Sequence, residues 1–220
     1  MRTVTCNCET SFEADLPDQI DLDHEPGRLD QILAGSFFQI TCPNCGNTLK
    51  PELRVRLISA KAGIDLIVLP EMERLSFFLG EMDVPKGTEL LIGYAELFER
   101  ARIVVDGLDA TAIEIVKYWL RLKAEESAPE AQEITVAYAG FQAAEAAKTG
   151  PRKLVFHISG IKEGEVAVLP VGEDYYGRIL ADKAKTLRAE PFVTMFKGPY
   201  RSIRMLESIA EGNAEGGAAE

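Results

Sequence analysis

The chain has 220 residues, 46% of them hydrophobic and 27% charged, which is an ordinary composition for a globular protein with a substantial core. Its formal net charge is −11, which argues against a surface that binds nucleic acid. Its first residues lack the apolar core of a signal peptide, and no apolar run is long enough to cross a bilayer. We therefore expect a soluble, cytoplasmic protein that makes no membrane contact.

The first notable feature is a closely spaced cysteine pair, Cys6 and Cys8, in the segment TCNCE. An acidic stretch follows this pair and is opposed only by Arg28; its acids are Glu9, Glu13, Asp15, Asp18, Asp21, Asp23, Glu25 and Asp30. Such a stretch predicts a solvated loop, and a basic partner protein is the alternative explanation. A short helical pattern begins after Pro26 and stops at Gly35.

The second cysteine pair, Cys42 and Cys45, follows a predicted strand over residues 36–41. Beyond it, residues 52–59 alternate apolar and charged side chains, and residues 64–70 form another apolar run after a short turn. This pattern predicts a β-hairpin. A short helical segment over residues 72–80 and a strand over residues 88–93 complete this part of the chain.

Two consecutive helices are the best-defined prediction. Apolar residues recur at helical spacing from Tyr94 to Leu108, Gly107 suits a left-handed C-terminal cap, and Asp109 is a good N-cap for a helix over residues 110–126. Trp119 lies on the apolar stripe of the second helix, which predicts that it is part of the core. The two helices should meet at a tight corner.

The remaining chain reads as an α+β lobe. A polar connector over residues 123–133 precedes three predicted strands, a helix and a fourth strand; these cover residues 134–144, 153–160, 165–172, 175–188 and 191–196. We expect a zinc-binding domain over residues 1–125, an α+β C-terminal lobe over residues 126–208, and a disordered tail over residues 209–220. The predicted fold class is α+β: a zinc-ribbon-like module with a β-hairpin and a helical corner, followed by a β-rich lobe.

The four cysteines together predict a metal site. The segment CPNCG has the pattern of a zinc knuckle, in which backbone N–H groups of a turn point toward the sulfurs and Gly46 permits a positive φ. Two thiolates supply half of a tetrahedron, and Cys6 and Cys8 can supply the other half if they lie in an extended strand with both sulfurs on one side. A structural zinc site is the leading interpretation; a redox dithiol, buried unliganded thiols and a catalytic metal are the alternatives.

Other motifs carry less information. His24 could replace Cys6 as a ligand, although an exposed loop histidine is the simpler interpretation, and His157 reads as a packed or surface residue of a strand. The sequence contains neither of the glycine-rich nucleotide-binding motifs G-x-x-x-x-G-K-[ST] and G-x-G-x-x-G. No serine, histidine and aspartate grouping can be argued. The sequence therefore names no catalytic residue and no cofactor beyond the metal.

The chain resembles the CpXC-domain proteins of bacteria and archaea, an uncharacterised family defined by two short Cys-Pro-x-Cys elements. The resemblance rests on CPNCG at residues 42–46, on RLDQILAGSFFQIT before it, and on ELFERARIVVDGLDATAIEIVK after it, and it covers about residues 1–125. It implies that Cys42 and Cys45 bind zinc. The first motif, CNCE, departs from the family pattern because it lacks the proline and one residue and has Glu9 where glycine is usual.

These observations lead us to expect a non-enzymatic, zinc-stabilised protein that acts as a protein-interaction or regulatory module. Its metal ligands are expected to be Cys6, Cys8, Cys42 and Cys45. The alternatives are a thiol-dependent or metal-dependent enzyme, a nucleic-acid-binding zinc ribbon, which the acidic charge disfavours, and a regulatory module with an apolar ligand pocket in the C-terminal lobe.

Overall fold

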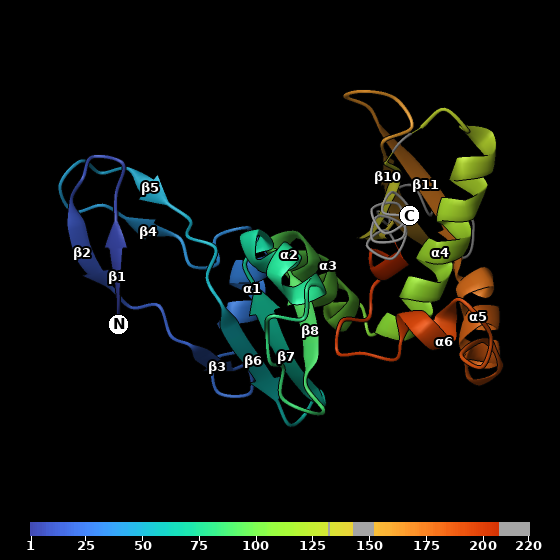
Figure 1. Ribbon diagram of the computed structural model, residues 1–220, viewed down its shortest axis with the longest axis horizontal. Coiled ribbons are helices and arrows are strands. Elements are labelled where there is room, and N and C mark those ends of the chain that lie inside the picture. The colour runs from blue at the N-terminus through green and yellow to red at the C-terminus, as the bar shows by residue number, and fades with distance from the viewer. Residues whose placement is uncertain (132, 143–151, 207–220) are drawn as a thin grey trace, which may run out of the picture. The chain divides into compact units, whose positions relative to one another are not determined.

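A computed structural model describes residues 1–131, 133–142 and 152–206 (Figure 1). The chain divides into two compact units, residues 1–101 and residues 102–220. Both units combine helices with strands, so the predicted α+β class is confirmed. The predicted disordered tail at residues 209–220 lies outside the described residues.

The first unit contains two small hairpins and a four-stranded sheet. Each hairpin is antiparallel: β1 (Arg2–Thr5) pairs with β2 (Ser11–Ala14), and β4 (Ile40–Thr41) pairs with β5 (Thr48–Leu49). The sheet has the order β3-β6-β7-β8, and its strands are β3 (Gln19–Asp21), β6 (Val55–Ser59), β7 (Ile64–Leu69) and β8 (Glu89–Ile92). Strands β6 and β7 are antiparallel, which confirms the predicted hairpin, whereas the two outer pairings are parallel.

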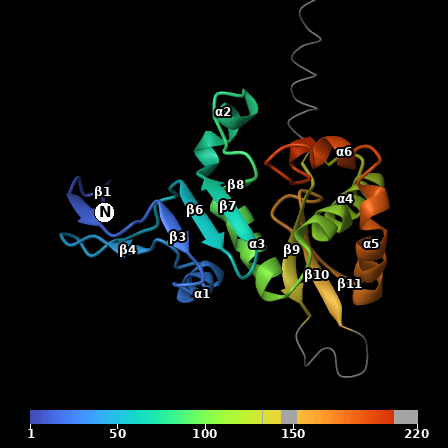
Figure 2. The same cartoon turned by 90° about the horizontal axis from the view of Figure 1, so that it is seen from below.

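Four helical segments accompany this sheet, and two of them contribute buried residues to its core. They are α1 (Gly27–Leu33), the 3-10 turn η1 (Glu71–Glu73), α2 (Arg74–Phe78) and α3 (Tyr94–Val105), which continues beyond the unit (Figure 2). Val55 and Leu57 of β6 point inward at every second residue, as the alternation predicts. They share a core with Ile32 of α1 and Leu97 of α3. The sheet and these two helices therefore form one packed body.

The acidic stretch is not the solvated loop that the sequence had suggested. It contains β2 and β3, because Phe12 and Ala14, and then Ile20 and Leu22, place apolar side chains at every second position. The short helix predicted after Pro26 is confirmed as α1. The predicted strand over residues 36–41 is reduced to Ile40–Thr41. The preceding residues make a turn instead, in which Phe38 adopts a φ of 54° and stacks on Phe37 at a centroid distance of 4.2 Å.

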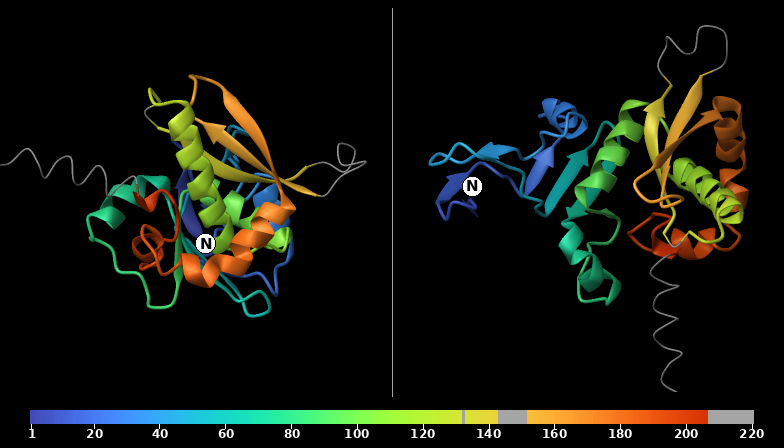
Figure 3. Two further views of the ribbon diagram at one scale, coloured as in Figure 1. Left: turned by 90° about the vertical axis from the view of Figure 1, so that its right-hand side faces the viewer. Right: turned by 90° about the horizontal axis from the view of Figure 1, so that it is seen from above.

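The second unit packs helices against a three-stranded antiparallel sheet of order β11-β10-β9. Its elements are α4 (Ala110–Ser127), β9 (Thr135–Phe141), β10 (Lys153–Ser159), β11 (Val166–Gly172), α5 (Glu173–Thr186) and α6 (Phe192–Met195). Figure 3 shows α4 and α5 on the same face of this sheet. Ile113 and Val116 of α4 share a core with Tyr138 of β9 and Phe156 of β10.

The helical corner forms as predicted, since Gly107 has a φ of 68° and the Asp109 carboxylate accepts the Ala112 N–H at 2.8 Å. Two other predictions in this unit are wrong. Residues 191–196 contain a helical turn rather than a strand, and Trp119 keeps 38% of its surface exposed, because α4 rests on the sheet through Ile113, Val116 and their neighbours.

The division between the units falls inside α3, earlier than the predicted boundary at residues 125 and 126. The difference arises because α4 buries its apolar face in the core of the second unit. Whether residues 1–125 fold alone stays a prediction. No helix in the described part of the chain is both long and apolar enough to span a membrane.

Candidate metal centre

The two cysteine pairs lie in the turns of the two small hairpins. Cys6 and Cys8 belong to the turn between β1 and β2, and Cys42 and Cys45 belong to the turn between β4 and β5. Figure 1 shows these hairpins beside one another at one end of the unit. The prediction that Cys6 and Cys8 lie in an extended strand is wrong, because β1 ends at Thr5 and both cysteines lie in the turn that follows it.

Both turns are closed by the same hydrogen-bonding scheme. In the second turn the Cys42 N–H donates to the carbonyl of Asn47 at 2.9 Å, and the Gly46 N–H donates to the carbonyl of Cys42 at 3.0 Å. In the first turn the Cys6 N–H donates to the carbonyl of Thr10 at 2.9 Å, and the Glu9 N–H donates to the carbonyl of Cys6 at 2.8 Å. The first turn therefore has the same hydrogen-bond pattern as the second turn but is one residue shorter.

The residue after each pair adopts a left-handed backbone conformation. Gly46 has a φ of 73° and Glu9 has a φ of 66°. A glycine reaches this region without steric cost, whereas a residue with a side chain does not. The departure of CNCE from the family pattern thus preserves the shape of the turn at the expense of strain at Glu9.

The four sulfur atoms converge on one point. Their Sγ atoms all lie within 4.8 Å of one another, with Cys6 Sγ 3.6 Å from Cys45 Sγ and Cys8 Sγ 3.7 Å from Cys42 Sγ. A disulfide requires an S–S distance of about 2.05 Å, so the cysteines are free thiols. Each close contact joins one hairpin to the other. The four cysteines are thus positioned to hold a metal ion.

The sulfurs differ in exposure and in acidity. Cys6 and Cys42 are buried, whereas Cys45 is exposed. Hydrogen bonds from the Thr10 hydroxyl and backbone N–H lower the pKa of Cys8 to about 5. The Asn47 backbone N–H favours the Cys45 thiolate, but loss of water and the neighbouring thiols outweigh it and raise the pKa of Cys45 to about 12. Four adjacent thiolates repel one another, so joint ionisation requires a cation between them.

Two polar residues beside the sulfurs were not identified from the sequence. The Thr10 hydroxyl lies 3.4 Å from Cys8 Sγ, and the Asn44 amide donates to the same sulfur at 3.8 Å. Both lie in or next to the turns, but only the folded geometry shows that they face Cys8. His24 does not join the cysteines, because its Nδ1 lies 2.7 Å from Asp21 Oδ2. His157 is exposed on β10, as expected of a surface strand residue.

Comparison with known proteins identifies the family. The family model described as CpXC protein matches residues 4–117, which include the turns of both hairpins and all four cysteines. The chain belongs to the CpXC family. A Treponema pallidum (strain Nichols) protein described as an uncharacterized protein is 28% identical over 220 residues, which cover 93% of this CpXC chain and 97% of that protein. No solved structure matches the chain.

The strain at Glu9 gives a test of the short first turn. Replacing Glu9 with glycine removes the steric cost of its positive φ, so we expect a gain in stability of about 0.5–1 kcal/mol. Thermal unfolding of the metal-loaded CpXC protein measures it. Glu9→Ala is the control, since alanine removes the carboxylate but keeps the strained backbone. Equal stability changes in the two variants would assign the effect to charge rather than conformation.

Proposed function

We propose that this CpXC protein holds one zinc ion as a closed structural site and acts, without catalysis, as a protein-interaction or regulatory module. The observation that carries the zinc assignment is the gathering of four Sγ atoms from two turns. A tetrahedral zinc with Zn–S distances of about 2.3 Å has sulfurs about 3.8 Å apart. The distances of 3.6 and 3.7 Å between the hairpins agree with that geometry.

The role proposed for the metal is folding. Strands β4 and β5 have only two residues each, which is too few for a hairpin to be stable without support. Zinc bound by Cys42 and Cys45 on one hairpin and by Cys6 and Cys8 on the other would join two short hairpins whose strands fully bury only Ala14. Four protein thiolates fill a tetrahedron, which supports a site with no open position for a substrate. Free thiols also suit a reducing compartment such as the cytoplasm.

A thiol-dependent enzyme is the second candidate, and the environment of Cys8 favours it. Its lowered pKa and partial exposure are properties of a reactive cysteine. Hydrogen bonds that stabilise a thiolate also suit a metal ligand, so alkylation separates the two roles. We expect iodoacetamide to modify Cys8 slowly in the zinc-loaded protein and rapidly after chelation. Rapid modification without loss of zinc would support thiol chemistry.

An exposed apolar stripe supports the interaction role. Met72, Leu75 and Leu79, on η1, α2 and the turn after α2, are 88, 69 and 64% exposed. They follow one another at helical spacing, so they lie on one side of this segment. Side chains of this size on a surface are typical of sites that bind proteins. Photo-cross-linkers placed at Leu75 and, as a control, at the exposed His157 test whether this face is contacted in cells.

A nucleic-acid partner is disfavoured because the two arginines in and directly before β6 are already paired with carboxylates. The Arg56 guanidinium makes two hydrogen bonds to the Asp65 carboxylate, at 2.8 and 2.7 Å, and Arg54 pairs with Glu73 at 2.9 Å. Phosphate binding requires cations that are not already neutralised. We expect no binding of duplex DNA or single-stranded RNA tighter than about 10⁻⁴ M in an anisotropy titration at moderate salt. Submicromolar, salt-sensitive binding that is lost in Arg54→Glu would overturn this expectation.

Metal analysis tests the central proposal. Native mass spectrometry of the protein purified without added metal is expected to show one zinc ion per chain. Chelation should then unfold the two hairpins but leave the unfolding transition reported by Trp119 unchanged, because Trp119 lies on α4 of the second unit. A metal-free protein with ordered hairpins would contradict the structural role.

A further inference from the structure

A pocket in the first unit has no role in the proposed metal site. It has a volume of about 370 Å³ and is lined largely by apolar atoms. Its buried walls are formed by Ile32 of α1, Phe37 of the following turn and Leu97 of α3, and Phe98 lies at its exposed rim. This volume and lining are typical of sites for small organic ligands. The pocket lies within residues 1–101, not in the C-terminal lobe where the ligand-binding alternative had placed it.

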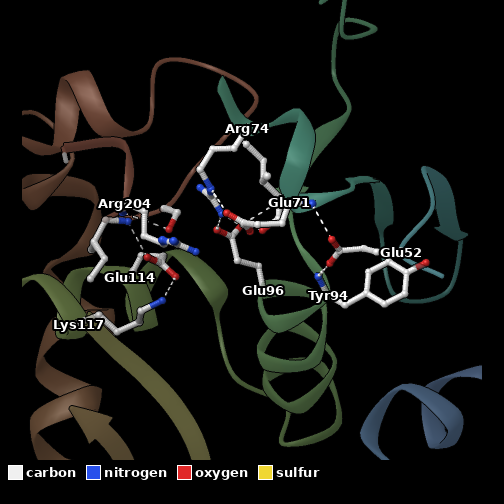
Figure 4. Close-up of polar contacts among 11 residues, drawn as sticks. Glu52, Glu71, Arg74, Tyr94, Glu96, Glu114, Lys117 and Arg204 are labelled. Atoms are coloured by element: carbon white, nitrogen blue, oxygen red, sulfur yellow. Dashed lines mark hydrogen bonds and ion pairs between the residues drawn. The ribbon is translucent and has the colours of Figure 1, made fainter. Parts of the chain in front are cut away.

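The pocket has two charged lining residues, Glu52 and Lys50, and only Lys50 is placed to pair with a ligand. Figure 4 shows the Glu52 carboxylate between the backbones of Tyr94 and Glu71. Its Oε1 accepts the Tyr94 N–H at 2.6 Å, and its Oε2 accepts the Glu71 N–H at 2.7 Å. Tyr94 is the first residue of α3, so the positive end of the helix dipole compensates this carboxylate. Glu52 is therefore a structural cap.

Lys50 is the available charge at the pocket rim. Its Nζ donates to the carbonyl of Gly35 at 2.7 Å, and this contact holds the ammonium beside another lining residue. An ammonium group has three donors, and no carboxylate among the described residues forms an ion pair with Lys50. The pocket thus combines an apolar interior with one positive group at its mouth.

We propose that this pocket binds a small organic molecule with an apolar body and a single carboxylate. The apolar body lies against Ile32, Phe37 and Leu97, and the carboxylate pairs with Lys50. A neutral ligand of the same shape would gain the apolar contacts but not the charged hydrogen bond. A dianionic ligand would meet no second cation among the lining residues. The pocket contains no cysteine, so the proposal goes beyond the metal site and does not depend on the identity of the metal.

A matched pair of probes tests the proposal. The zinc-replete full chain is titrated with 4-phenylbutyrate and with 4-phenylbutanol, which differ in charge but not in apolar body, and binding is followed by the amide NMR signals of Gly35, Leu97 and Phe98. We expect the acid to bind wild type roughly three- to tenfold more tightly than the alcohol, the range of a partly solvated charged hydrogen bond.

Three variants assign the effect to Lys50. Lys50→Gln should bring the affinity for the acid down to that for the alcohol, whereas Lys61→Gln, an exposed lysine in the turn after β6, should leave both affinities unchanged. Lys50→Arg should retain the preference for the acid. Equal binding of acid and alcohol to wild type, an unchanged preference in Lys50→Gln, or no shift at the pocket signals with either probe would each overturn the proposal.

Discussion

Replacing Cys42 with serine is expected to abolish stable zinc binding and to unfold both cysteine hairpins. The serine hydroxyl is a poor zinc ligand, and in a site of this kind the free energy of metal binding contributes directly to folding. We expect the zinc affinity to fall by more than about 100-fold. Competition with a chromogenic chelator measures this affinity, and Asn7→Ser, an exposed change in the first turn, is the matched control.

Cys6→Ser should also weaken zinc binding, but by less than Cys42→Ser. Both sulfurs are buried, so the difference comes from the turns and not from exposure. The turn of Cys42 has glycine at the left-handed position, whereas the turn of Cys6 has the strained Glu9. The second turn is therefore better organised to hold the metal before it binds. Equal losses of affinity in the two serine variants would contradict this difference.

Replacing Glu114 with alanine is expected to destabilise the second unit strongly. Glu114 and Lys117 of α4 form an ion pair at 2.7 Å, with side chains only 8 and 4% exposed, and Glu114 also accepts the Ile203 N–H at 2.9 Å (Figure 4). The Glu114→Ala change breaks this buried ion pair and leaves the Ile203 N–H without its acceptor, which together cost about 3–5 kcal/mol. The Tm should fall by more than about 10 °C.

The same helix provides the control for this effect. Glu125 pairs with Arg121 at 2.7 Å on the exposed side of α4, and such pairs contribute less than about 1 kcal/mol. Fluorescence of Trp119, the one tryptophan of the chain, reports the unfolding of this unit. If Glu125→Ala and Glu114→Ala shifted the transition equally, burial of the Glu114–Lys117 pair would not be the source of its stabilisation.

Local signals made parts of the fold predictable. The helical corner depends on Gly107 and Asp109, whose effects act within one turn of chain, and the β6–β7 hairpin depends on strict alternation of side chains. The spacing of the cysteines likewise indicated that they gather, although not that Cys6 and Cys8 share a turn. In the corner, in the hairpin and within each cysteine pair, the residues that determine the structure are close in sequence, whereas the two pairs meet only through the fold.

The sequence-based predictions fail where tertiary contacts, or two competing sequence patterns, determine the secondary structure. The many acids between Cys8 and Gln31 concealed the apolar alternation that forms β2 and β3. The short apolar run at residues 191–196 fits a helix or a strand equally well, and packing selects the helix. The cap that Glu52 gives α3 joins residues 42 positions apart in the sequence, so no local pattern could predict it or the pocket beside it.

X-ray absorption spectroscopy at the zinc edge tests the central claim most directly. The protein is purified without added metal, so that the bound ion reflects its own selectivity. The proposed site predicts four sulfur scatterers at about 2.3 Å and no nitrogen or oxygen in the first coordination sphere. A spectrum with a light-atom ligand would indicate an open or mixed site, and protein without zinc would show that the gathered thiols of Cys6, Cys8, Cys42 and Cys45 serve another purpose.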